Sequence, residues 1–94
     1  MVTGLRALVV AGTAVLMLAL GAAPAVAADG TVGVRETVCA QTLDVRTTAG
    51  GAWMGTLYSG QTFLVEGPSS DGYIYGFAYG YINRHGWVQN GWFC

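Results

Sequence analysis

One run of alternating aromatic residues limits what this chain can fold into more than any other feature. Five rings occupy every second position from Tyr73 to Tyr81, and the positions between them hold Ile74 and three small residues. Side chains alternate between the two faces of a strand, so a strand would gather these rings on one face. A helix would scatter the rings and hold glycines in its interior at about 1 kcal/mol each. The run therefore predicts a β-strand, or two strands joined by a kink.

The sequence leaves open which face of this strand is buried. We favour a core made by the rings, with Phe63 and Trp87 beside them, because the glycines between the rings would let the strand bend tightly. In the alternative, part of the ring row is an exposed surface for a proline-rich peptide or a sugar chain, since tyrosine offers an apolar face and a hydroxyl group. Self-association is a third interpretation. The residues predicted to bind a ligand are Tyr73, Tyr75, Tyr79, Tyr81 and Arg84.

The N-terminal 28 residues have the pattern of a cleaved secretory signal peptide. Arg6 precedes an apolar run that ends at Gly21 and Pro24 and is followed by small residues. The small residues allow cleavage after Ala27 or after Ala28, and we favour the second. The alternative is a membrane anchor, but Gly21 and Pro24 interrupt the stretch and no charged cluster follows it. We therefore predict a secreted protein, with no stable membrane insertion after cleavage.

The charge of the predicted mature chain excludes two classes of partner. Residues 29–94 carry three arginines, no lysine and five carboxylates, which gives a formal charge of −2. A nucleic-acid-binding protein needs a cationic surface for phosphates, so we expect no nucleic acid partner. Electrostatic adhesion to anionic lipid or to anionic wall polymers is disfavoured for the same reason.

The two cysteines, Cys39 and Cys94, predict a disulfide bond. A domain this small buries only about 60% of its unfolded surface and is marginally stable unaided. Disulfides persist in the oxidising space outside the cell. A bond between the two cysteines would close a loop of about 56 residues, worth about 4 kcal/mol in the chain-entropy model. An intermolecular bridge and a reactive thiol pair are the alternatives, and the second lacks the close spacing that activates a thiol.

The remaining pattern predicts a small all-β domain. A lead-in over 29–38 shows no clear period and is expected to be flexible. Apolar residues then alternate in short segments separated by turn residues, which is typical of a small barrel or sandwich. Beside the aromatic run, we expect strands at 41–47, 53–57, 61–66 and 87–88. We expect loops at 48–52, 67–72 and 83–86.

The order of these segments resembles the bacterial SH3 domain family over residues 41–88. The matching motifs are Leu-Asp-Val-Arg at 43–46, Gly-Thr-Leu-Tyr-Ser-Gly at 55–60, Phe-Leu-Val at 63–65, Gly-Tyr at 72–73 and Gly-Trp-Val at 86–88. The resemblance implies an SH3-like barrel of five or six strands over 39–94, with peptide or cell-wall ligands. Three features depart from the family. Its members usually carry polar residues in the strand that Tyr73 opens, whereas this chain alternates rings and small residues there. A Thr-Thr-Ala-Gly-Gly loop at 47–51 replaces its Ser-Gly-Pro loop, and the chain has no room for the enzyme that such modules often accompany.

No arrangement of residues predicts catalysis, a metal or a cofactor. His85 is the only histidine and is expected in an exposed turn. The serines lie in turn contexts with no base and orienting group around them, and a single histidine gives no metal-ligand spacing. We therefore predict a monomeric, non-enzymatic module that recognises an extracellular peptide or a peptidoglycan-type glycopeptide, in the cell wall or outside it. The alternative is a small secreted effector or inhibitor that acts on another protein.

Overall fold

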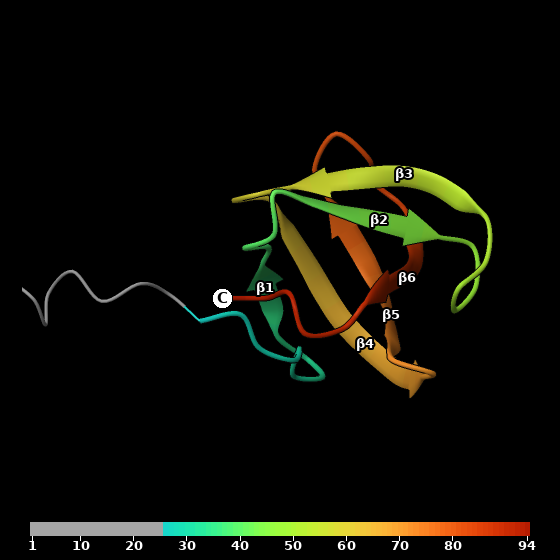
Figure 1. Ribbon diagram of the computed structural model, residues 1–94, viewed down its shortest axis with the longest axis horizontal. Coiled ribbons are helices and arrows are strands. Elements are labelled where there is room, and N and C mark those ends of the chain that lie inside the picture. Colours follow the sequence, from blue (N-terminus) through green and yellow to red (C-terminus); the bar gives the residue numbers. More distant parts are fainter. Residues whose placement is uncertain (1–25) are drawn as a thin grey trace, which may run out of the picture.

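The computed structural model describes residues 26–94, which form one sheet of six antiparallel strands with no helix among them (Figure 1). The all-β prediction is thereby confirmed. All but the last three residues of the predicted signal peptide lie outside the described residues. The strands are β1 (Arg35–Thr37), β2 (Thr42–Arg46), β3 (Trp53–Tyr58), β4 (Thr62–Ser70), β5 (Tyr73–Tyr79) and β6 (His85–Gln89).

The strands are ordered β1-β4-β5-β6-β2-β3 across the sheet. Three pairs, β2–β3, β4–β5 and β5–β6, join strands that are consecutive in the chain, while β1 pairs with β4 and β2 with β6. Figure 1 shows the sheet bent so that β2 and β3 run across the direction of β4 and β5. Strands β1 and β3 are the two edges of the sheet.

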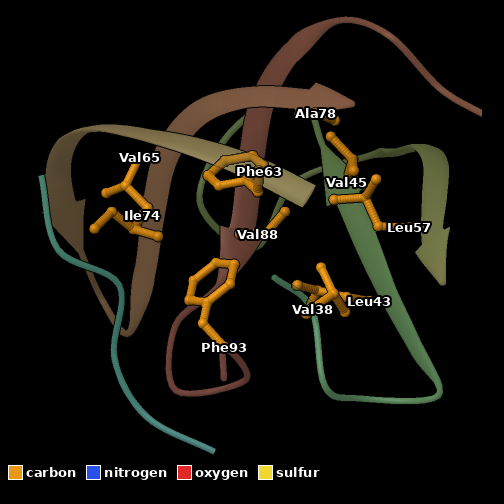
Figure 2. Packing of buried hydrophobic residues seen from close by; sticks show 10 residues of the cluster. All are labelled: Val38, Leu43, Val45, Leu57, Phe63, Val65, Ile74, Ala78, Val88 and Phe93. Atoms are coloured by element: carbon orange, nitrogen blue, oxygen red, sulfur yellow. The ribbon is translucent and has the colours of Figure 1, made fainter. Parts of the chain in front are cut away.

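The hydrophobic core lies inside this bent sheet. Figure 2 shows its side chains pointing toward one another from the strands and from the segment after β6. No polar or charged residue of the described chain is buried with them. The core residues are Val38, Leu43, Val45, Leu57, Phe63, Val65, Ile74, Ala78, Val88 and Phe93.

The inner face of β5 is the face with the small residues, so the expected burial of the ring row in the core is wrong. Ile74, Gly76 and Ala78 are buried, whereas every ring of β5 is half-exposed. The cause lies on the neighbouring strand, where the buried Phe63 sits opposite Ala78 in the β4–β5 register. A Cβ atom on Gly76 would come within 2.6 Å of the Phe63 ring, so the large residue on β4 needs a small one on β5.

Strand β4 is longer than the sequence pattern predicts. It continues to Ser70 after a register shift between Val65 and Ser69, so most of the expected loop at 67–72 belongs to the strand. Only Asp71 and Gly72 make the turn into β5. Both have positive φ, at 50° and 81°, as in the two-residue hairpin turns that match strand twist.

A disulfide bond and a pair of backbone hydrogen bonds connect the N-terminal part of the described chain to its C-terminal end. The predicted disulfide is confirmed, because Cys39 and Cys94 are bonded with their Cα atoms 5.5 Å apart. Beside it, Ala28 and Phe93 exchange two backbone hydrogen bonds of 2.7 and 3.0 Å. Strand β1 pairs with β4 inside the segment predicted as a lead-in. Its three residues are too few to show a period in the sequence.

Candidate binding groove

The five residues predicted to bind a ligand do not form one site. Two of them, Tyr75 and Tyr79, lie on the outer side of β5, opposite the core. Tyr73 lines a hollow near the C-terminus. Tyr81 and Arg84 come together in a groove beside β3. These three places differ in how their aromatic rings are used.

Tyr75 and Tyr79 belong to an outer aromatic face, which also includes Phe77, His85 and Trp87. Ring centroids are 4.8 Å apart between Phe77 and Tyr79 and also between Phe77 and His85. Tyr75 stacks on His85 at 5.6 Å and contacts Trp87 at 5.5 Å. The rings of β5 and β6 are cross-strand neighbours, and such pairs stabilise a sheet.

Two charged side chains, Arg35 and Glu66, contact rings of the outer aromatic face. The guanidinium carbon of Arg35 lies 3.8 Å above the centre of the Tyr79 ring, a cation–π geometry. Nε2 of His85 lies 3.2 Å from a carboxylate oxygen of Glu66. His85 was expected in a turn, but it is the first residue of β6 and packs between rings. The rings here are in contact with one another, so this face is a packed layer over the sheet.

Tyr73 lines a C-terminal hollow of about 330 Å³, which is bounded by β2, the end of β6 and Trp92. Arg46 is one of its lining residues and is already engaged inside the protein. Its guanidinium donates a hydrogen bond of 2.9 Å to the carbonyl of Gly51 and lies 3.6 Å from a carboxylate oxygen of Asp44. The hollow is mostly polar and offers no uncompensated charge from this arginine.

Tyr81 and Arg84 line the β3 groove, a hollow of about 480 Å³ between β3 and the turn that follows β5. Three large rings with high exposure meet here, with Tyr81 at 86%, Trp53 at 62% and Tyr58 at 43%. Tyr58 and Tyr81 stand edge to face with centroids 5.7 Å apart. Aromatic side chains with one polar group are typical of binding surfaces, because they bury much area and still make hydrogen bonds.

Both walls of the β3 groove are held in place by local contacts. On β3, the indole nitrogen of Trp53 donates to the hydroxyl of Thr56 at 3.0 Å, and that hydroxyl lies 3.1 Å from a carboxylate oxygen of Asp44. On the turn, the amide of Asn83 donates to the carbonyl of Gly80 at 2.8 Å. The groove is therefore formed before any ligand binds, which reduces the entropy lost on binding.

The two walls meet where Ile82 packs on β3. A Cβ atom on Gly55 would lie 2.4 Å from the tip of Ile82, so only glycine lets the turn approach the strand this closely. The close approach is what brings Tyr81 beside Tyr58. Arg84 lies at the same turn and is the one charged residue that lines the groove. Within residues 26–94 it has no ion-pair partner.

Sequence reasoning missed Trp53 and Tyr58, the two rings that β3 contributes to the groove. Strict alternation along the expected strand at 53–57 places Trp53 on the same face as Leu57, which is buried. A register shift in the β2–β3 pair places Trp53 opposite Arg46, at the mouth of the hairpin, and leaves its ring exposed. The signal in the sequence is a segment with rings at both ends and no charge between them, but the exposure of Trp53 depends on a register shift that leaves no local pattern.

The described residues hold no group of three or more His, Cys, Asp or Glu side chains placed to bind a metal ion. Within the same residues, no helix has the length and apolar character needed to cross a membrane.

Neither a protein-family model, nor a curated protein, nor a solved structure matches this chain significantly. The β3 groove, where three exposed rings meet, is the candidate binding site.

Proposed function

We propose that this protein is an exported, non-enzymatic binding module with an SH3-like barrel, and that its β3 groove binds extracellular peptides. The observation that carries the proposal is the meeting of three exposed rings, Trp53, Tyr58 and Tyr81, at one preformed groove. Monomeric proteins rarely expose large apolar patches without a partner. The disulfide supports the setting, because it points to an oxidising space such as the exterior of the cell.

A peptide fits this groove better than the other ligand classes. The groove is elongated along a strand, mostly apolar, and carries the cation of Arg84 at one side. Rings in a shallow groove are a recurring surface for extended or proline-rich peptides. The unpaired arginine would bind a carboxylate of the ligand, from an acidic side chain or a C-terminus. The peptide could be free or part of the cell wall, and its chemistry at the groove would be the same.

Export rests on the predicted signal peptide, and cleavage after Ala27 or after Ala28 has different consequences for the fold. Cleavage after Ala27 would keep the two backbone hydrogen bonds that Ala28 exchanges with Phe93. Cleavage after Ala28, which the sequence favours, would remove them. The intact mass of the exported protein distinguishes the two products.

Selection from a displayed library of random peptides tests the proposed function. We expect the exported protein to enrich peptides that share apolar residues and a carboxylate. Tyr81→Ala should weaken their binding about tenfold, because an exposed ring at the centre of a small site is a typical hot spot. Tyr75→Ala is the matched control, since it removes a ring of the outer aromatic face and should leave the affinity unchanged.

Two results would contradict the proposal. One is a library that yields no peptide above background. The other is a Tyr81→Ala variant that binds the selected peptides as tightly as the original protein does. Binding to intact cell-wall material, measured beside the free peptides with the same two variants, distinguishes a wall-linked peptide from a soluble one.

A further inference from the structure

The two edges of the sheet are unequal in a way that bears on the ligand. Strand β1 has three residues, two of them charged, whereas β3 has six residues with no charge and no proline. An edge strand presents unpaired backbone groups to any passing chain, and proteins commonly protect it with charge, proline or shortness. The edge at β1 has such protection. The edge at β3 has neither charge nor proline and is twice as long, and it lies along the groove, where the turn at 81–84 contacts it at Gly55.

The hydrogen-bonding pattern identifies which backbone groups of β3 point away from the sheet. The amide of Ser59 donates to the carbonyl of Gln41, so this pair is a hydrogen-bonded pair. In the same register Leu57 lies opposite Leu43, and bonded pairs alternate along an antiparallel ladder. Leu57 therefore bonds to β2, while the N–H and C=O of Thr56 point outward at the edge.

The neighbouring Tyr58 supports this assignment. Its backbone N–H donates to the side-chain oxygen of Gln61 at 2.9 Å, and its carbonyl accepts from the Gln61 amide at 2.9 Å. Both groups of Tyr58 thus face away from β2, as the alternation requires, and both are already bonded. Strand β3 has β2 as its only strand partner among residues 26–94. Thr56 is the position where the edge is open to another chain.

The β3 groove lies along this open edge. Its lining includes Gly55, which faces the turn, as well as Met54 and Thr56, and the turn at 81–84 forms the opposite wall. An extended chain that fills the groove would run beside β3 at hydrogen-bonding distance. Its alternate side chains would point to the rings, and an acidic group could reach Arg84.

We propose that the ligand peptide binds as a seventh strand on β3 and exchanges two backbone hydrogen bonds with Thr56. This inference rests on the proposed function and specifies its ligand. The ligand is an extended segment with alternating apolar residues and one carboxylate, and is not a polyproline helix. Strand addition takes its affinity from the backbone and its specificity from pockets for alternate side chains. Here the rings and Arg84 supply those contacts.

N-methylation of a bound library peptide, one amide at a time, tests the mode of binding. Each methyl group removes one N–H donor. We expect one sensitive amide, because a single peptide N–H donates to the Thr56 carbonyl: its methylation should weaken binding about tenfold, and methylation of the amides on either side should change it less than about twofold. A polyproline helix makes no backbone ladder, so it would leave every amide of the series insensitive.

Hydrogen exchange of the protein gives a second, independent readout. In the free protein the Thr56 amide should exchange quickly and the Leu57 amide slowly. On addition of the peptide the Thr56 amide should slow by about tenfold or more, because it becomes hydrogen-bonded. A peptide that binds with no change at Thr56 and no sensitive amide in the methylation series would overturn strand addition and leave the proposed function standing.

A pair of variants at Thr56 completes the test. Thr56→Pro removes the outward N–H, which an edge strand tolerates, and Thr56→Val removes only the hydroxyl. We expect the proline variant to bind peptide about fivefold more weakly than the valine variant. If the proline variant does not fold, the hydrogen-exchange and methylation results alone decide whether the peptide adds to β3 as a strand.

A second copy of this chain is the alternative occupant of the edge. It would slow hydrogen exchange at the Thr56 amide as the protein concentration rises in the absence of peptide, and that result would contradict this proposal. A library without a binder would remove the proposed function and this inference together.

Discussion

The outer aromatic face and the β3 groove are built from the same kinds of residue and use them in opposite ways. On the outer face each ring contacts another ring or a cation, and the rings of Tyr75, Phe77, Tyr79 and Trp87 are half-exposed. In the groove the rings of Trp53 and Tyr81 keep most of their surface in solvent. The difference is not one of composition. It arises because β5 and β6 are central strands with cross-strand partners, whereas β3 is an edge and its neighbour is a turn.

The comparison shows that an aromatic row in a sequence does not by itself locate a binding surface. Rings on adjacent central strands satisfy one another and stabilise the sheet. Rings at an edge, held by a close backbone approach, remain available to a ligand. Three predictions test this division of roles, and they are ordered by the size of the expected effect on stability.

The largest effect is expected where the ring row meets the core. Gly76→Ala should lower the free energy of unfolding by about 3 kcal/mol, because its new methyl group would overlap the carbonyl of Leu64 and press on Phe63. Urea denaturation measures the change. Ser69→Ala, on an exposed position of β4, is the control and should stay within about 0.5 kcal/mol. A Gly76→Ala protein as stable as the original would mean that the small face of β5 is not required by Phe63.

An intermediate effect is expected on the outer aromatic face. Phe77→Ala should lower stability by about 2 kcal/mol, since Phe77 contacts both Tyr79 and His85 and is half-buried. Peptide affinity should not change. Tyr81→Ala is the counterpart, with a loss of affinity and a stability within about 0.5 kcal/mol of the original, because its ring is exposed. The comparison of the two regions fails if Phe77→Ala weakens peptide binding and leaves stability intact.

The smallest effect distinguishes two arginines. Arg35 lies over the Tyr79 ring and donates a hydrogen bond to Thr62 at 2.8 Å, so Arg35→Met should cost about 0.5–1 kcal/mol of stability. Arg84 has no such partners within the described residues, so Arg84→Met should leave the melting temperature unchanged. It should weaken the binding of acidic peptides several-fold, and added salt should reduce that difference. Equal melting temperatures and equal affinities for both variants would remove the role assigned to each cation.

Some features of this molecule could be predicted from local sequence. The alternation of rings identified β5 as a strand, because period two is a property of the strand itself. The count of two cysteines, together with the predicted signal peptide, predicted the disulfide that the structure shows. The loop expected at 67–72 contains the turn before β5 at Asp71 and Gly72, although the strand before it extends four residues further than the pattern indicated.

The remaining features depend on contacts between distant residues. Alternation shows that the two faces of β5 differ, but the face that is buried is decided by Phe63 on the neighbouring strand. The groove depends on the approach of Ile82 to Gly55, which are 27 positions apart in the sequence. Neither the register of β4 against β5 nor that approach leaves a local pattern, so the division of the predicted tyrosines among three places could not be foreseen.

The bonds that Gln61 makes to Tyr58 have a consequence for how this protein behaves at high concentration. An edge strand without charge can pair with a strand of another molecule, and repetition of this pairing produces fibrils. Here Gln61 occupies the backbone groups at one end of β3, and the register shift near Arg46 breaks the ladder at the other. In the proposed mode of binding, the stretch of β3 between these two points would admit one short peptide and could not be extended. We therefore expect a protein that keeps an adhesive edge exposed and still resists polymerisation.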